Sequence, residues 1–305
     1  MLAATITEDV IEGFYAELLA AGRAASTRNH YVTILNALFR WAARKGAIAR
    51  SPLSADSSLR RSKAAQRRRR ISAEEERALL AAADDLTRGA GPRLQWIIIA
   101  ALETGARLGE LLAIRWADVN LEKRRVLIRA VEEGAKKTDR ARQLSMSARL
   151  FATLEMANTD PAGRTYPPIA YVFGALGERL KSVKKAWASV VLRAHGHEPE
   201  WVAGKLSAVS REPLRVIDLH FHDLRHEAGC RWLEAGWPIH HVREMLGHGN
   251  LAQTSTYLHV DELGLEESMK RFDDFRGKTV AKEGDKELRP VGHETDASAA
   301  KDLLH

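Results

Sequence analysis

The sequence predicts a mainly α-helical protein with one small antiparallel β-sheet, an α+β chain of two unequal domains. Its 305 residues exceed one ordinary domain and fall short of three. Along most of the chain apolar residues recur at spacings of three and four, as on amphipathic helices, and only residues 124–146 alternate with period two. With 45% apolar and 29% charged residues, the composition excludes fibrous and wholly disordered proteins.

The N-terminal region is predicted to contain two helices and a basic linker. The helices cover about residues 8–20 and 26–45, and each begins at polar residues of the kind that cap helices. Residues 53–70 are rich in Ser and Arg and show no periodicity. We therefore expect a short helical domain over residues 1–52 and a linker over residues 53–70.

The larger domain is expected over residues 71–276. A hairpin or small antiparallel sheet is predicted over residues 124–146, and residues 195–217 are interpreted as an elaborated loop. The tail, residues 277–305, carries five cations, six acids and few large apolar side chains, so we expect disorder or only conditional order there. Helices are predicted at about 71–86, 92–102, 108–114, 178–194, 222–235, 239–246 and 251–257.

Positive charge is concentrated near the N-terminus. Residues 22–70 hold thirteen cations against the single acid Asp56, although the whole chain carries only +7. With Tyr31, Phe39 and Trp41 interleaved, this block is typical of binding to a nucleic-acid backbone. A solvated helix face followed by a charged linker would have the same composition, and this alternative stays open for the block alone. The candidate DNA-binding residues are Arg28, Arg40, Arg44, Lys45, Arg67, Arg68, Arg69 and Arg70.

The cysteine content and the apolar runs indicate a cytoplasmic protein with no membrane partner. Cys230 is the single cysteine, which excludes a disulfide framework and any zinc site that needs two thiolates. We expect it to be a small buried thiol. Apolar runs such as residues 96–102 are far shorter than the roughly 18 residues of a membrane span, and no export signal is visible.

Five short motifs could carry chemistry, and each is ambiguous alone. Arg107 stands between two glycines at a predicted helix N-terminus, which suits a phosphate but equally a turn with a surface arginine. Lys136 and Lys137 end a predicted hairpin, where lysines are normally just solvated. Tyr257 lies on a predicted helix, where a lone tyrosine usually belongs to the core or its rim.

Two histidine motifs complete the set. His222 and Arg225 are three apart and share one helix face. His248 stands between glycines just after a helix, where no neighbour offers a packing wall. His222 and His226, four apart, could also form a zinc pair, although no Glu follows the first histidine as in metalloproteases. The third zinc ligand would then come from His240, His241, His248 or His259.

Together these groups are those needed to break a phosphodiester without a metal: cations for the phosphate oxygens, proton donors and acceptors, and a nucleophile. In order and spacing the chain resembles the tyrosine recombinase, or phage integrase, family over roughly residues 8–262, close to Xer-like site-specific recombinases. The motifs that carry the resemblance are Thr104-Gly105-Ala106-Arg107-Leu108-Gly109-Glu110, Lys137-Thr138, His222-Asp223-Leu224-Arg225-His226, Leu246-Gly247-His248 and Tyr257.

The resemblance implies a site-specific recombinase or integrase that cuts and rejoins DNA without metal, ATP or another cofactor. Tyr257 would attack the scissile phosphate and form a 3′-phosphotyrosine link. Arg107 and Arg225 would clamp the non-bridging oxygens, and His248 would donate a hydrogen bond to them.

The same resemblance gives proton-transfer roles to two further groups. His222 would help to accept the tyrosine proton. Lys137 would protonate the leaving 5′-oxygen, although the adjacent Lys136 is an alternative.

The resemblance also implies partners and a domain arrangement. We expect double-stranded DNA as substrate, a homotetramer on two synapsed sites, a monomer when free, and a location at the nucleoid. Relatives carry a four-helix, SAM-like core-binding domain, whereas only two such helices are predicted here, so we favour a truncated N-terminus over a minimal domain. The alternatives are an inactive DNA-binding relative and a type IB topoisomerase-like relaxing enzyme.

Overall fold

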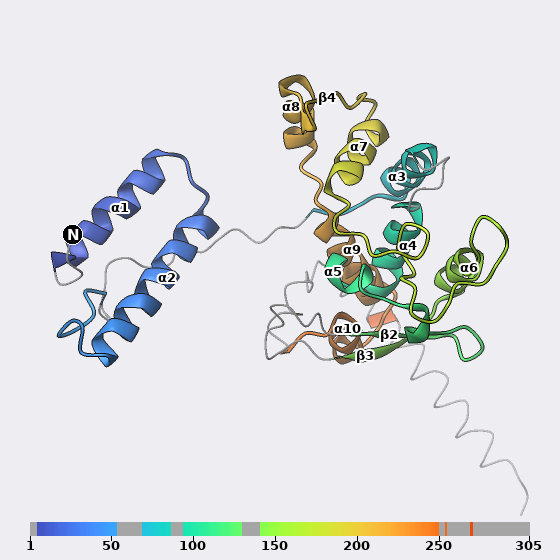
Figure 1. The fold of residues 1–305 in the computed structure, drawn as a ribbon, viewed down its shortest axis with the longest axis horizontal. Coiled ribbons are helices and arrows are strands. Elements are labelled where there is room, and N and C mark those ends of the chain that lie inside the picture. The colour runs from blue at the N-terminus through green and yellow to red at the C-terminus, as the bar shows by residue number, and fades with distance from the viewer. Residues whose placement is uncertain are drawn as a thin grey trace, which may run out of the picture. The chain divides into compact units, whose positions relative to one another are not determined.

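The structure is a computed structural model that describes residues 5–53, 69–86, 94–129, 141–249, 254 and 269–270. The chain divides into two compact units, residues 1–68 and 69–305, and each is described by itself (Figure 1). Within the described ranges, no helix combines the length and apolar character needed to cross a bilayer.

The first unit is a pair of helices, α1 (Glu8–Ala20) and α2 (Ala25–Arg44), close to the predicted ranges. α1 ends at a turn in which Gly22 has a φ of +67°, a conformation that glycine adopts without steric cost. α2 begins slightly earlier than its predicted cap at residue 26. Five apolar side chains form a small core: Ile11, Phe39, Ala42, Ile48 and Leu53.

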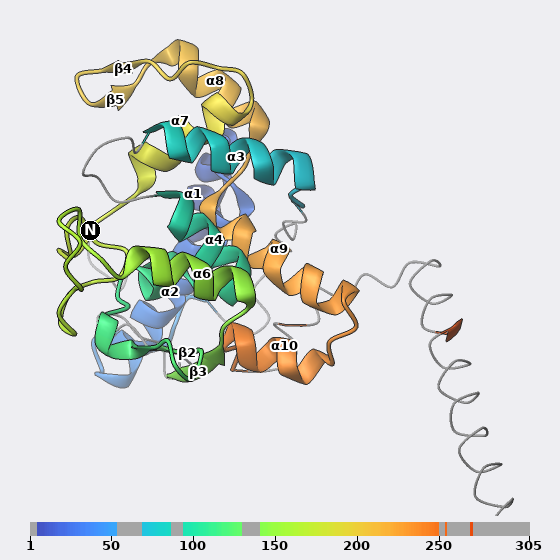
Figure 2. The ribbon, with the colours of Figure 1, turned by 90° about the vertical axis from the view of Figure 1, so that its right-hand side faces the viewer.

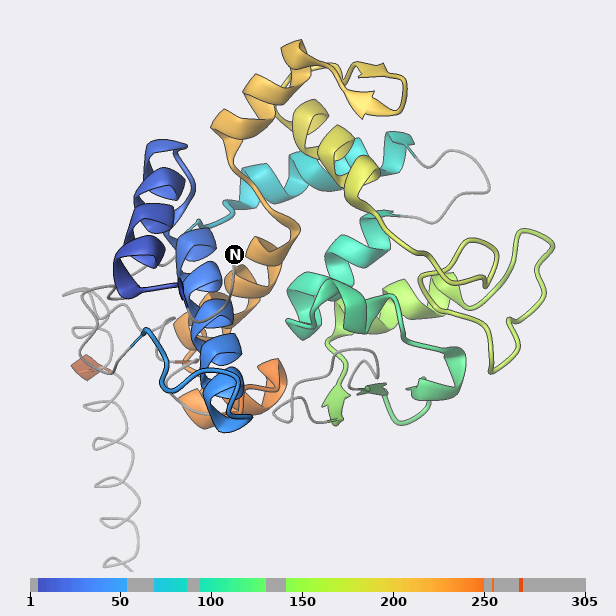
Figure 3. The same ribbon diagram turned by 60° about the vertical axis from the view of Figure 1, so that its left-hand side comes forward.

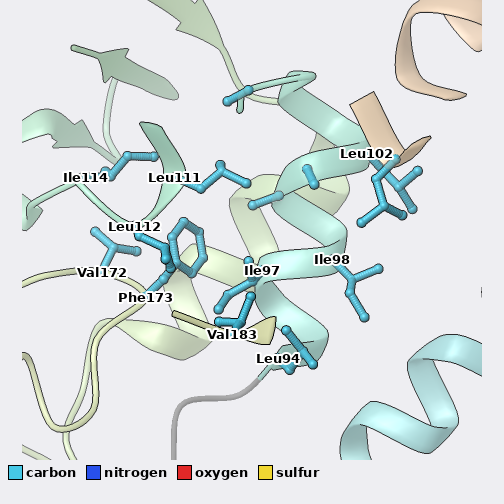
Figure 4. Close-up of a cluster of buried hydrophobic side chains, with 14 of the residues drawn as sticks. Leu94, Ile97, Ile98, Leu102, Leu111, Leu112, Ile114, Val172, Phe173 and Val183 are labelled. Atoms are coloured by element: carbon cyan, nitrogen blue, oxygen red, sulfur yellow. The ribbon is translucent and has the colours of Figure 1, made fainter. Parts of the chain in front are cut away.

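The second unit is built around α4 (Leu94–Thr104), a helix that is apolar on nearly every side and therefore buried. It packs against α3 (Ala73–Leu86), α6 (Ala148–Ala157) and α9 (Phe221–Glu234), as Figure 2 shows. In Figure 4, Ile97 points toward Phe173 and Val183, whereas Ile98 and Leu102 leave the other side of the helix. α4 thus contributes buried side chains to the core on two of its sides. This packing fixes the position of the C-terminal end of the helix.

A three-stranded antiparallel sheet covers one edge of this core. It consists of β1 (Val119–Asn120), β2 (Arg125–Ile128) and β3 (Arg142–Ser145), in that order. Val126 pairs with Leu144 in the register, and both side chains are buried, as alternation predicts. α10 (Ile239–Leu246) lies against β3. The predicted small antiparallel sheet is confirmed, with β1 as an addition.

The interpretation of residues 195–217 as a loop was wrong. Figure 3 shows this segment in gold: a hairpin of β4 (Trp201–Val202) and β5 (Lys205–Leu206), followed by α8 (Ala208–Ile217). The Ser207 hydroxyl caps α8 by accepting a hydrogen bond from the Ser210 backbone at 3.2 Å. Two short polar strands and a helix with an internal proline carry weak periodicity, which explains the error.

Other element boundaries also differ from prediction. α7 (Lys184–Ala194) begins later than the expected residue 178, because the backbones of Ala175 and Glu178 exchange two hydrogen bonds, at 3.0 and 2.9 Å, that close a turn there. α5 (Leu108–Leu111) is a single turn, shorter than predicted. α6 was not predicted, although Ser147 caps it by accepting from the Leu150 backbone at 3.1 Å. The predicted helix at 251–257 and the tail lie outside the described residues, apart from Thr254.

The start of the second unit is tied to α9 by a buried carboxylate. Glu227 is 2% exposed and accepts hydrogen bonds from the Ile71 backbone at 2.9 Å, from Arg70 Nε at 2.8 Å and from Arg231 Nε at 2.8 Å. Burial alone would raise the pKa of Glu227, but the bonds from Arg70 and Ile71 hold it below its usual value. Two positions from Arg225, Glu227 lies on nearly the opposite helix face, so it anchors α9 without entering the site.

Candidate active site

Arg107 emerges from a tight turn that joins α4 to α5. Gly105 has a φ of +58°, and a Cβ there would lie 2.6 Å from Leu246 Cδ2 and 3.0 Å from Trp232 Cη2. Both the conformation and the close approach therefore require glycine. The Glu110 carboxylate accepts from the Arg107 backbone at 2.8 Å and from Arg107 Nη1 at 3.1 Å, which caps α5 and holds the guanidinium.

Arg225 is a buried cation that joins three distant segments. It lies on α9, is 2% exposed, and donates from Nη1 to the Gly105 carbonyl and from Nη2 to the Leu246 carbonyl, both at 2.7 Å. The Leu246 carbonyl belongs to the last turn of α10, where helix carbonyls lack intrahelical partners and the dipole favours a cation. The two carbonyls therefore set the direction of the guanidinium plane.

His248 follows α10 directly. The helix ends at Gly247 in the left-handed conformation, with a φ of +67°, and this turn delivers the imidazole to the site. Its Nδ1 lies 2.9 Å from Oγ1 of the fully buried Thr254. Burial, then repulsion from Arg225 and Arg107, lowers the pKa of His248 to about 4, so the ring is neutral at pH 7.

His222 stands in the first turn of α9. The helix start is fixed by Asp223, which is buried and accepts a hydrogen bond from the His220 backbone at 2.8 Å. Phe221 packs edge-on against Trp187, with ring centroids 5.1 Å apart. Loss of water around the ring, followed by repulsion from Arg225, lowers the pKa of His222. A neutral imidazole can accept a proton.

Four of the six predicted catalytic residues are thus brought together. Arg225, Arg107 and His222 all act electrostatically on His248, although Arg107 directly precedes α5, His222 and Arg225 lie on α9, and His248 follows α10. Lys137 and Tyr257, as well as the alternative Lys136, lie outside the described residues.

The predicted DNA-binding residues are spread over both units. Arg40, Arg44 and Lys45 are exposed on or just after α2, which also carries Arg28. Arg69 pairs with Glu75, and Arg70 pairs with Glu227 and Glu234. Arg67 and Arg68 lie outside the described residues.

Two polar residues of the site were not predicted. Thr254 holds His248, and Arg142 contacts Glu110 on one side and α10 on the other. Arg142 left a signal in the alternation of its strand, which puts it on the same face as the buried Leu144. An arginine on an inward face needs a carboxylate partner, and that partner was already inside the Arg107 motif. No comparable signal marks Thr254.

The zinc alternative finds no support in the part of the chain that the structure describes. There, no group of three or more His, Cys, Asp or Glu side chains is arranged to hold a metal ion. His226 instead lies 3.6 Å from the thiol of Cys230. Burial raises the pKa of that thiol to about 11, as expected for an inert buried cysteine.

The site concentrates positive charge and hydrogen-bond donors. The guanidiniums of Arg107 and Arg142 pair with the Glu110 carboxylate, and that of Arg225 is held by two backbone carbonyls. The imidazoles of His222 and His248 lie near them, each with a lowered pKa. Planar guanidiniums match the geometry of phosphate oxygens, and neutral imidazoles can donate or accept protons. Chemically, the arrangement suits an anionic, tetrahedral group whose charge grows during reaction.

Comparison with known proteins identifies the family to which the chain is similar. The phage integrase family matches residues 69–263. A XerC-like tyrosine recombinase of Caldanaerobacter subterraneus subsp. tengcongensis is 25% identical, over 82% of this chain and 66% of its own length. The tyrosine recombinase XerC of a Mycobacterium species (strain KMS) is 28% identical, over 84% of this chain and 79% of its own. The chain spans only 33% of a shufflon-specific DNA recombinase of Escherichia coli.

Solved structures show the same fold at low sequence identity. The Tn1549 transposon integrase in complex with a circular intermediate DNA has a TM-score of 0.63 at 16% identity, covering 88% of this chain and 86% of that one. A lambda integrase dimer bound to a COC′ core site has a TM-score of 0.58 at 17% identity, covering 86% and 84%. The predicted mainly helical fold with a small antiparallel sheet is confirmed, and the chain belongs to the phage integrase family of tyrosine recombinases.

Proposed function

We propose that this protein is a site-specific DNA recombinase that cuts and rejoins strands through a 3′-phosphotyrosine intermediate on Tyr257. The phenolic oxygen forms a bond to phosphorus while the bond from phosphorus to the 5′-oxygen breaks. The phenol proton passes to His222, and the leaving 5′-oxygen receives a proton from Lys137. Attack by a free 5′-hydroxyl on the phosphotyrosine reverses these changes, so no nucleotide cofactor is needed.

The observation that carries this proposal is the orientation of Arg225 by two backbone carbonyls, beside Arg107 and a neutral His248. Carbonyls direct a guanidinium and add no net negative charge, so the cation is preorganised for phosphate oxygens. Nε2 of His248 would donate a hydrogen bond to one of those oxygens. Preorganised donors of this kind are each worth about 10²- to 10³-fold in rate.

The test is covalent capture of the protein on DNA. Adducts trapped on genomic DNA identify the target sequence, and nicked duplexes built from it prevent rejoining after cleavage. The wild-type chain should form an adduct linked through Tyr257, in EDTA and without ATP, and Tyr257→Phe should form none. Tyr171→Phe is the matched control, because within the described part of the chain the Tyr171 hydroxyl accepts a single hydrogen bond, from Arg115 at 3.2 Å.

An adduct through another residue, or none with wild-type protein, would contradict the proposed chemistry. The second outcome would instead favour an inactive DNA-binding relative.

Double-stranded DNA is the proposed partner, supported by the DNA complexes of the two integrases with this fold. We infer that the working assembly is a homotetramer on two synapsed sites, with a monomer in free solution, acting in the cytoplasm at the nucleoid. In that assembly each subunit would hand a C-terminal segment, residues 264–275, to its neighbour, so deletion of residues 263–305 should reduce recombinant yield more than duplex affinity. An unchanged yield would argue against exchange of C-terminal segments between subunits.

A further inference from the structure

Arg142 occupies a central position that the proposed reaction does not use. It is the first residue of β3, its side chain is 9% exposed, and no role has been given to it. Its guanidinium forms a fork with Glu110, from Nη2 to Oε2 at 2.9 Å and from Nη1 to Oε1 at 3.2 Å. The remaining nitrogen, Nε, donates to the Met245 carbonyl at 2.8 Å. One planar group therefore holds two separate segments.

The first of these segments carries Arg107. Glu110 is only 4% exposed and receives both arginines on the same two oxygens. Burial would raise the pKa of Glu110, but the hydrogen bonds from Arg142, followed by the bond from the Arg107 backbone, hold it below its usual value. The carboxylate is therefore ionised, and Arg142 fixes the group that in turn fixes Arg107.

The second segment carries His248. Met245 and Leu246 are the last residues before Gly247, and their carbonyls accept from Arg142 and Arg225, respectively. Arg142 also packs on the turn itself, because a Cβ at Gly247 would lie 2.9 Å from its Nη1 and 3.1 Å from its Cζ. Two guanidiniums thus occupy consecutive carbonyls at the C-terminus of α10, where the helix dipole favours them.

We propose that Arg142 is a positioning residue for strand cleavage, which sets Arg107 and His248 at a common distance from the same phosphate. The inference rests on the proposed function. A displacement of about 1 Å at such groups typically costs on the order of 10²-fold in rate. Lysine keeps the charge of Arg142 but has one nitrogen, and so it cannot hold Glu110 by a fork and the Met245 carbonyl at once.

The test compares Arg142→Lys and Arg142→Met with Arg125→Lys as matched control. Arg125 lies on the neighbouring strand β2, is exposed, and donates a hydrogen bond to the Gln143 side chain at 3.3 Å. Arg142→Lys should lower the rate constant of adduct formation at saturating DNA about 10²-fold and change the duplex Kd less than about threefold. Arg125→Lys should change neither.

A substrate with sulfur in place of the 5′-bridging oxygen separates positioning of the phosphate clamp from delivery of the leaving-group proton. The thiolate leaves without a proton, so a defect in proton delivery would be repaired. We expect the Arg142→Lys defect to persist. Repair by sulfur, or an oxygen-substrate rate within threefold of wild type, would overturn the proposal.

Amide hydrogen exchange gives a second measurement that needs no activity. Residues 105–111 and 245–249 should exchange about tenfold faster in Arg142→Lys, and should be unchanged in Arg125→Lys. Unchanged exchange in both segments would overturn the positioning role. If wild-type protein formed no adduct, the proposed function would fail, and the exchange data would still decide the role of Arg142. If Arg142→Met fails to fold, the lysine variant carries the test.

Discussion

At the scale of single residues, the site depends on the planar fork of arginine. Arg225 donates to two carbonyls on different segments, those of Gly105 and Leu246. A lysine ammonium is a point charge and can satisfy only one of those carbonyls. The geometry of the group, in addition to its charge, should therefore matter for the rate.

Arg225→Lys should reduce adduct formation about 10²- to 10³-fold while duplex affinity changes only a few-fold. The measurement is single-turnover cleavage of a nicked duplex at saturating protein. Arg215→Lys is the control, because Arg215 is exposed and pairs with the neighbouring Glu212. A rate within threefold of wild type would mean that charge alone suffices.

His248 links the site to the pH dependence of stability. Its folded pKa of about 4 lies below the unfolded value near 6.5. Between these values the unfolded chain binds a proton that the folded chain does not. The contribution of the neutral His248 to the free energy of unfolding is therefore fully present above pH 6.5 and is lost as the pH falls toward 4.

Between pH 7.5 and pH 5, the resulting loss of unfolding free energy should be about 1 to 2 kcal/mol smaller in His248→Gln than in wild type. Urea denaturation at both pH values measures it. His220→Gln is the control, since the His220 side chain is 63% exposed. Equal losses in wild type and His248→Gln would contradict the lowered pKa.

At the scale of elements, two tight turns deliver the phosphate-binding groups. The turn at Gly105 precedes Arg107, and the turn at Gly247 precedes His248; both have positive φ. At Gly105 the neighbouring helices also approach so closely that a side chain has no room. Backbone strain and overpacking should therefore add at this position.

Gly105→Ala should destabilise the protein by about 2 to 4 kcal/mol, from about 1 kcal/mol of left-handed strain and the rest from overpacking against Leu246 and Trp232. Gly163→Ala isolates the first contribution, because Gly163 has a φ of +78° and nothing within 4 Å of a Cβ. Thermal or urea unfolding compares the two variants. Equal losses of stability in the two variants would show that the side chains around Gly105 move aside without cost.

The helices and strands differ in how well the sequence predicts them. α10 begins and ends where its apolar spacing and Gly247 indicate, and α4 is recognisable by its continuous apolar run. The hairpin and α8 between residues 201 and 217 were missed, because two-residue strands have almost no period and Pro213 lies inside the helix. Short elements are stabilised by contacts such as Trp201 Nε1 to Ser189 Oγ at 3.1 Å, which spacing alone does not reveal.

At the scale of the whole molecule, the charge on α2 predicts how DNA affinity responds to salt. Arg40 and Arg44 are exposed one helical turn apart. Each phosphate contact contributes about one to the slope of log affinity against log salt. The first unit should therefore supply part of a sequence-independent electrostatic affinity.

Replacing both Arg40 and Arg44 by Gln should reduce that slope by about two and weaken binding similarly on every duplex. Fluorescence anisotropy across a salt series measures it. Arg164→Gln is the control, because Arg164 is 80% exposed in the other unit and pairs with Asp160. An unchanged slope would place the phosphate contacts elsewhere on the chain.

The order of its motifs determined the family of this protein, and apolar spacing determined most of its helices. Each motif and each helix is a local pattern, formed by residues that are close together in the sequence. Only tertiary structure decided how the site is braced. Arg225 meets a carbonyl 120 residues away, and Arg142 meets a carboxylate 32 residues away. Such pairs depend on how buried helices and a small sheet pack, and packing energy is shared among many contacts rather than encoded in any local pattern.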